Sequence, residues 1–243
     1  MSALPYGRVM SETPRKVHVY LLNGNSNAHL TKTMARLATK LCPEARFESD
    51  TVSAAPRYIS TPEHVAVARQ HILDHVHERL ARGHSQPDAL LLACFGEPGL
   101  IELREHIKLP SVGMLEAGIA TAMQSGRRFA ILTTGSDWPP MLADLIAFYG
   151  VERRCVGIET LSHDACARSA AIWKPELRRQ IVDIAGRTGA DVVLVGGGPV
   201  SGRALAVGAL PGIVLIDAFA AALVQVNALS KINAIKSFRK TND

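Results

Sequence analysis

Short apolar runs alternate with longer amphipathic segments along most of the chain. The predicted strands lie at residues 17–22, 46–53, 88–94, 111–114, 128–132, 154–159, 191–195 and 213–216. The predicted helices lie at residues 30–41, 62–82, 99–106, 115–124, 139–149 and 176–187, and a last one starts at residue 217. Alternation of this kind is typical of parallel sheets covered by helices on both faces, which predicts an α/β fold.

Three landmarks recur in the same order in the two halves of the chain. VYLLNGNS (19–26) matches FAILTTGS (129–136), DALLLACFGEPG (88–99) matches DVVLVGGGPVSG (191–202), and the strand-to-helix junction at Glu116 matches that at Asp217. Any two parallel α/β units share some likeness, but three landmarks in order favour a repeat. We therefore predict two pseudo-symmetric α/β lobes with the active site in the cleft between them, where strand ends from both would meet.

We expect the first lobe to comprise residues 17–112 plus 215–243, with this C-terminal segment packing back on it. Residues 113–214 would form the second lobe and residues 1–16 an N-terminal tail.

Composition narrows the class of protein. Hydrophobic residues make up 47% of the chain and charged ones 20%, which is ordinary for a globular protein. The formal net charge is +5, but the Lys and Arg residues are scattered and only 5% of residues are aromatic, so we expect no nucleic-acid partner. A basic pocket for an anionic small molecule would be equally compatible with this charge. The longest apolar stretch, 212–229, contains Asp217, Gln225 and Asn227, which argues against a membrane span.

The cysteines point to the cellular compartment and to the chemistry. The four cysteines lack CxxC pairs and zinc-finger spacing, so we expect neither a metal cluster nor a disulfide framework. The N-terminal segment has no apolar stretch of the signal-peptide type. A cytoplasmic protein is predicted.

Cys94 is the main candidate for catalysis because it ends an apolar strand and a glycine turn follows it at once. In open α/β sheets, ligands bind and catalytic residues lie at the carboxyl ends of the strands. The backbone N–H groups of Phe95 and Gly96 would form an anion nest beside the sulfur and lower its pKa from about 8.5. Such a nest would also hold the oxygen of an enolate. Alternatively, Cys94 is only a small buried hydrophobe.

Small polar residues follow the first strand of each half. Asn25 in the first half and Thr133 and Thr134 in the second could hydrogen-bond a substrate, or could serve as helix caps. Glu97, Glu116 and Asp217 are weaker candidates, and an N-cap explains Asp217.

Other motifs give weaker evidence for a function. His71 and His75 have a spacing that could hold a metal, but the solvated face of a helix is the better explanation for them and for their neighbours His64, His77 and His84. His163 and Asp164 could reach the cleft from a loop. GGGPVSG lacks the last glycine of a dinucleotide fingerprint, and there is no GK[ST] phosphate loop.

Seven motifs together resemble the aspartate/glutamate racemase superfamily, in particular its hydantoin and allantoin racemase branch. They are NGNSNAHLT (23–31), APRYI (55–59), ACFGEPGL (93–100), VGMLEAG (112–118), ILTTGSDW (131–138), the GGGP turn and IDAFAAAL (216–223). The resemblance implies a cofactor-independent enzyme, with no metal, in which one cysteine from each lobe faces opposite sides of the stereocentre. Cys94 stands where the family has its first cysteine, and Gly197 where it has the second.

We therefore expect a racemase or isomerase that acts on a hydantoin, an amino acid or a related carboxylate or amide. Cys94 would move the α-proton, backbone N–H groups near Phe95, Gly96, Gly197 and Gly198 would stabilise the enolate, and Asn25, Thr133 and Thr134 would position the substrate. The alternatives are a single-cysteine decarboxylase or cis–trans isomerase of the same superfamily, and a catalytically silent ligand-binding homologue. We further expect a homo-oligomer.

Overall fold

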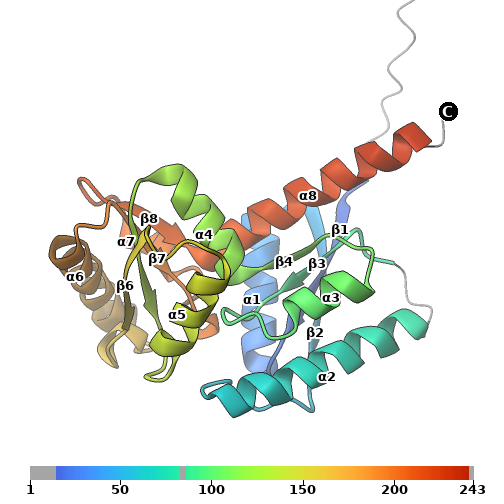
Figure 1. Cartoon of the computed structure of the whole chain (residues 1–243), viewed down its shortest axis with the longest axis horizontal. Helices are drawn as coiled ribbons and strands as arrows, with labels where there is room; N and C mark the ends of the chain where they lie inside the picture. The colour runs from blue at the N-terminus through green and yellow to red at the C-terminus, as the bar shows by residue number, and fades with distance from the viewer. Residues whose placement is uncertain (1–14, 83–85, 241–243) are drawn as a thin grey trace, which may run out of the picture.

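Two four-stranded parallel sheets lie side by side in the computed structural model, which describes residues 15–82 and 86–240 (Figure 1). The first sheet has the order β2-β1-β3-β4, and the second has the order β6-β5-β7-β8. The first set of strands is β1 (Val17–Asn23), β2 (Ala45–Thr51), β3 (Ala89–Leu92) and β4 (Ser111–Gly113). The second is β5 (Phe129–Thr133), β6 (Cys155–Thr160), β7 (Val192–Val195) and β8 (Val214–Asp217). The predicted α/β fold with two lobes is confirmed.

Helices connect the strands and cover the faces of the sheets. They are α1 (Ala28–Leu41), α2 (Pro62–Ala81), α3 (Leu100–His106), α4 (Met114–Ser125), α5 (Trp138–Phe148), α6 (Ala170–Thr188), α7 (Arg203–Val207) and α8 (Ala218–Lys240), with short 3-10 turns at Asp164–Cys166 and Gly198–Val200. The central strands β3 and β7 are buried along their whole length, as uniformly apolar strands of a covered parallel sheet should be.

The repeat seen in the sequence extends to individual hydrogen bonds. Asp88 precedes β3 and accepts a hydrogen bond from the backbone N–H of His18 at 2.8 Å, just as Asp191 accepts one from Arg128 at 2.8 Å before β7. Gly99 and Gly202 stand at the starts of α3 and α7 with φ of 80° and 82°, a left-handed conformation that favours glycine. The two lobes therefore share loop geometry as well as strand order.

The last helix of each half crosses to the other half. α4 follows the first sheet but packs against β7 and β8, whereas α8 follows the second sheet and packs against β1, β3 and β4 (Figure 1). The two crossing helices also pack against each other, and Gln225 Nε2 of α8 donates to the backbone oxygen of Ala117 in α4 at 2.7 Å. The C-terminal helix α8 thus packs on the first sheet. The expected boundary between residues 214 and 215 is wrong by a few residues, because β8 belongs to the second sheet.

Two helical segments differ from the predicted ones. α6 begins at Ala170, six residues before the predicted start, and runs through Pro175. A proline lacks the N–H of a helical hydrogen bond, so Pro175 obscures the helical pattern at this end of α6. α7 was not predicted, since its five residues are too short to show a periodic pattern. In the described part of the chain, no helix has both the length and the apolar character needed to cross a bilayer.

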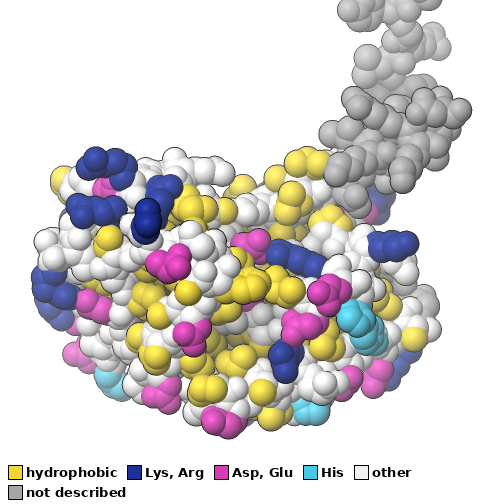
Figure 2. Space-filling model, in the orientation of Figure 1, with side chains coloured by type: hydrophobic (Ala, Val, Ile, Leu, Met, Phe, Trp, Pro, Cys, Tyr) yellow, Lys and Arg dark blue, Asp and Glu magenta, His cyan; other side chains and the backbone are white. Residues whose placement is uncertain are grey.

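Apolar side chains also reach the surface where the lobes meet. Figure 2 shows hydrophobic side chains along the middle of this face. Phe148 is 64% exposed and Ile101 38% exposed, and both border a groove between α2, α3 and α5. The expected homo-oligomer stays a prediction.

Candidate active site

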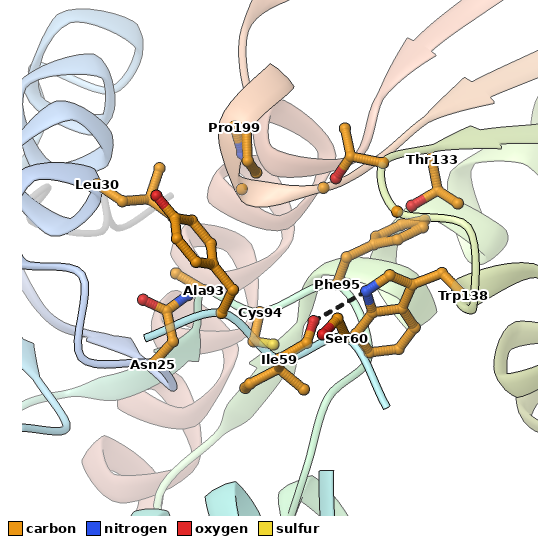
Figure 3. A pocket seen from close by; sticks show the side chains of 15 residues that line it. Asn25, Leu30, Ile59, Ser60, Ala93, Cys94, Phe95, Thr133, Trp138 and Pro199 are labelled. Carbon is orange, nitrogen blue, oxygen red and sulfur yellow. Dashed lines mark hydrogen bonds between the residues drawn. The ribbon is translucent and has the colours of Figure 1, made fainter. Parts of the chain in front are cut away.

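A cavity of about 270 Å³ lies between the lobes at the carboxyl ends of their strands. Its walls come from both sheets and from the loop between β2 and α2, and they consist of Asn25, Leu30, Tyr58, Ile59, Ser60, Ala93, Cys94, Phe95, Thr133, Thr134, Gly135, Trp138, Gly197, Gly198 and Pro199. Figure 3 shows Cys94 on one side of this cavity, with Thr133 and Pro199 of the second lobe across from it. The cleft predicted from the repeat is therefore present, and most of the predicted residues line it.

Among the described residues that line the cavity, Cys94 alone carries a thiol, and it is 8% exposed. Burial raises its pKa to about 11, and the charge of Glu97 acts in the same direction, whereas the nearby backbone N–H groups of Gly96 and Glu97 favour the thiolate and oppose the shift. The expected lowering of the pKa is therefore wrong. The nest exists, but loss of water around the sulfur outweighs it.

Glu97 lies behind Cys94 and ties the turn to two other elements. Its Oε1 accepts a hydrogen bond from the backbone N–H of Glu116 in α4 at 2.9 Å, and its Oε2 accepts one from the hydroxyl of Tyr149 at 2.7 Å. Burial raises the pKa of this carboxyl to about 7. Glu97 has a φ of 52°, which is unusual for a residue other than glycine. It does not line the cavity, so it holds the turn in place.

The second lobe presents Gly197 at the position equivalent to Cys94. Its φ is 127°, and a Cβ atom built on it would lie 2.9 Å from Thr134 Oγ1. Residue 197 therefore contributes no side chain to the cavity. The hydroxyl of Thr134 lies next to the space that a side chain at position 197 would occupy.

Asn25 lines the cavity, but part of its side chain is used locally. Its Oδ1 accepts hydrogen bonds from the backbone N–H of Asn27 at 2.9 Å and from Asn23 Nδ2 at 3.0 Å. The N-cap of α1 is Asn27, whose side chain accepts a hydrogen bond from the backbone N–H of Leu30, so Asn25 does not cap the helix. Its bonds hold the turn before the helix and leave its Nδ2 group for the cavity.

Two aromatic side chains reach from one lobe to the other, and each packs against a glycine that leaves room for its ring. The ring of Phe95 lies where a Cβ atom of Gly196 would be, and the ring of Trp138 lies where one of Gly96 would be. Gly96 therefore packs under Trp138 and does not line the cavity, although its backbone N–H favours the thiolate of Cys94. Trp138 Nε1 also donates to the backbone oxygen of Ile59 at 3.0 Å, which anchors the loop that carries Tyr58 and Ser60 (Figure 3).

Eight lining residues were not among the predicted ones: Leu30, Tyr58, Ile59, Ser60, Ala93, Gly135, Trp138 and Pro199. Tyr58, Ile59 and Trp138 lie within motifs that carried the resemblance, so a signal was present. Tyr58, Ile59 and Trp138 could not be found from their position along the strands, because the loop between β2 and α2 and the start of α5 bring them to the cavity.

The remaining candidates lie elsewhere. His163 and Asp164 are exposed and outside the cavity, and Asp217 caps α8 by accepting a hydrogen bond from the backbone N–H of Ala220 at 3.1 Å. His64, His71, His75 and His77 lie on α2, and His84 falls outside the described residues. Among the described residues, no cluster of His, Cys, Asp and Glu could hold a metal ion.

The sequence and fold of the chain match those of known proteins. A family model described as Asp/Glu/Hydantoin racemase matches residues 19–226. The chain belongs to this family. Its relatives in the Asp/Glu/hydantoin racemase family include the hydantoin racemase of Rhizobium meliloti, which is 27% identical over 216 residues that cover 88% of each chain.

Solved structures show the same fold. The allantoin racemase of Klebsiella pneumoniae superposes with a TM-score of 0.79 at 22% identity and covers 89% of each chain. Unliganded arylmalonate decarboxylase superposes with a TM-score of 0.64 at 18% identity, covering 88% of this chain and 92% of its own. The expected membership of the Asp/Glu/hydantoin racemase family, in its hydantoin racemase-like branch, is thus confirmed.

Proposed function

We propose that this member of the family is a cofactor-independent racemase or isomerase in which the thiolate of Cys94 takes an α-proton from the substrate. The observation that carries the proposal is the position of Cys94 in the interlobe cavity, next to the backbone N–H groups of the following turn, which favour its thiolate. A buried thiol of raised pKa ionises less often, but its thiolate is a stronger base. This property suits the removal of a weakly acidic C–H proton.

The walls of the cavity favour an uncharged substrate. Among the described residues, none of those that line it carries a formal charge, and Phe95, Tyr58 and Trp138 supply aromatic surface. A buried carboxylate or ammonium group without a partner costs several kcal/mol, so glutamate or aspartate would bind poorly. We propose a neutral cyclic amide of the hydantoin type. Asn25, Thr133 and Thr134 would position its polar groups, and the backbone N–H groups near Phe95, Gly197 and Gly198 would stabilise the enolate.

The test is incubation of each enantiomer of 5-benzylhydantoin with the protein in D₂O, with an enzyme-free blank subtracted. We expect deuterium at the α-carbon, and we expect Cys94→Ala to lower the exchange rate by about 10²-fold or more, the range in which acid–base groups contribute. Cys166→Ala is the matched control, since Cys166 is half-buried outside the cavity. Exchange that is absent in the wild type, or unchanged in Cys94→Ala, contradicts the proposal.

The presence of one thiol in the cavity favours a second candidate function, a single-cysteine decarboxylase or cis–trans isomerase. Such an enzyme would protonate its enolate from one face only, which a lone Cys94 could do. Release of CO₂ from a disubstituted malonate, with formation of one product enantiomer, would identify the decarboxylase.

A further inference from the structure

The two lobes present a glycine and a polar side chain to the cavity in opposite arrangements. In the first lobe, Gly24 follows β1 and Cys94 follows β3, and a Cβ atom built on Gly24 would lie 3.4 Å from Cys94 Cβ. In the second lobe, Thr134 follows β5 and Gly197 follows β7 at the equivalent places. The side chain is thus on the third strand in the first lobe and on the first strand in the second.

Thr134 occupies the space that a side chain at position 197 would need. A Cβ atom on Gly197 would approach Thr134 Oγ1 to 2.9 Å, and the φ of 127° at Gly197 disfavours any residue with a side chain. Among the described residues, the Thr134 hydroxyl has no hydrogen-bond partner within the protein, and Thr134 is half-buried at the cavity wall. The hydroxyl is therefore available to a molecule in the cavity.

We propose that the Thr134 hydroxyl takes the place of the second thiol and delivers a proton to the face of the substrate opposite Cys94. This inference rests on the proposed function, which requires an enolate in the same cavity. It assigns Thr134 a catalytic role beyond positioning the substrate.

The proton transfer balances with water as the co-reactant. The Cys94 thiolate takes the α-proton, and the electron pair of the broken C–H bond forms the enolate. The O–H bond of Thr134 then breaks to protonate the opposite face, while a water molecule in the cavity gives a proton to the threonine oxygen. The hydroxide that is left takes the proton from the Cys94 thiol, which restores the thiolate. No net charge, oxidant or reductant is needed.

The two faces of the substrate then behave differently. A threonine hydroxyl remains protonated at neutral pH and is a much weaker base than a thiolate. Removal of the Thr134 hydroxyl should therefore block inversion and leave Cys94 able to remove and return the proton on its own face. The diagnostic quantity is the ratio of α-deuteration with retention to inversion, measured by NMR and chiral chromatography in D₂O.

The experiment compares the wild type with Thr134→Val, Thr134→Ser and Thr33→Val, using both enantiomers of 5-benzylhydantoin. For the enantiomer whose α-hydrogen faces Cys94, Thr134→Val should raise the ratio of exchange to inversion at least tenfold, and Thr134→Ser should restore the wild-type ratio. Thr33→Val, on the surface of α1, is the matched control and should change nothing. Equal loss of exchange and inversion in Thr134→Val, or an unchanged ratio, overturns this inference while the proposed function stands. A wild type without α-deuteration overturns both.

Discussion

At the scale of single residues, the cavity is built on an asymmetric pair of positions. Cys94 and Gly197 were both predicted from the repeat, because the two strand-ending motifs could be aligned by their leading aspartates. The arrangement of Thr134 beside Gly197 could not be predicted. It depends on the backbone angle of Gly197 and on contact between neighbouring strands, neither of which a pattern along the chain records.

Gly197→Ala should destabilise the protein by about 1–3 kcal/mol. The new Cβ atom would force a residue with a side chain to adopt a φ of 127° and would crowd Thr134 Oγ1 at 2.9 Å. Urea unfolding followed by circular dichroism would measure the change in the free energy of unfolding.

Gly186→Ala provides the control for this substitution. Gly186 lies within α6, and a Cβ atom there would have no neighbour within 4 Å. It should leave stability unchanged or raise it by up to about 1 kcal/mol, because alanine favours the helix. Equal stability of Gly197→Ala and the wild type would show that the backbone at Gly197 is less constrained than its angle indicates.

At the scale of elements, the turn after β3 is held by contacts from the rest of the molecule. Glu97 joins it to the start of α4 through Glu116 and to the end of α5 through Tyr149. From the sequence, Glu97 was only a weaker candidate for the site. Its burial arises from the packing of α4 and α5 over the turn, which no local pattern could reveal.

Glu97→Gln should reduce the loss of stability that the wild type shows as the pH rises. Burial raises the pKa of Glu97 to about 7 from its ordinary 4.5, so the folded protein binds more protons than the unfolded one between these values. Stability therefore falls as the pH rises through this window, by roughly 3 kcal/mol for a shift of this size. Glutamine stays neutral and can keep both hydrogen bonds.

The measurement is the free energy of unfolding of both proteins at several pH values from 5 to 8.5. Glu97→Gln should be the more stable protein at the upper end and should have a shallower slope. Some slope should remain, because burial also raises the pKa of Asp217, to about 6. Parallel curves for the two proteins would contradict the assignment to Glu97.

Most elements could be predicted because their signals are local. Apolar runs such as 89–92 and 192–195 end in glycine turns, and α2 begins at Pro62 after Thr61, whose side chain accepts a hydrogen bond from the backbone N–H of His64. The start of α6 and the short α7 were missed because Pro175 and a five-residue length obscure the helical pattern.

At the scale of the whole molecule, exchange of α4 and α8 makes the two lobes depend on each other. One apolar core runs from the first sheet through these helices to Phe129 and Leu194 of the second sheet. A change in α8 should therefore affect both lobes.

Phe219→Ala should lower the free energy of unfolding by about 3–5 kcal/mol, because the Phe219 side chain is fully buried where α8 crosses between the lobes. Trp173 packs against the second apolar cluster of the second lobe, so its fluorescence reports on that lobe. In a Trp138→Phe background, the midpoint reported by Trp173 should fall together with the midpoint from circular dichroism.

Val224→Ala is the matched control on the same helix, since Val224 is 63% exposed, and it should change stability by no more than about 0.5 kcal/mol. If Phe219→Ala shifted the circular dichroism transition but not the Trp173 transition, the lobes would unfold independently.

The covalent joining of the two halves has a consequence for the chemistry at their junction. A dimer of two identical half-length chains with the same crossed helices would have to place the same residue on both sides of its central cavity. In a single chain, each copy of the repeat can change alone. The thiol at Cys94 and the hydroxyl at Thr134 thus become compatible within one cavity, and the faces of a bound ring can be treated differently by a scaffold that is nearly twofold symmetric.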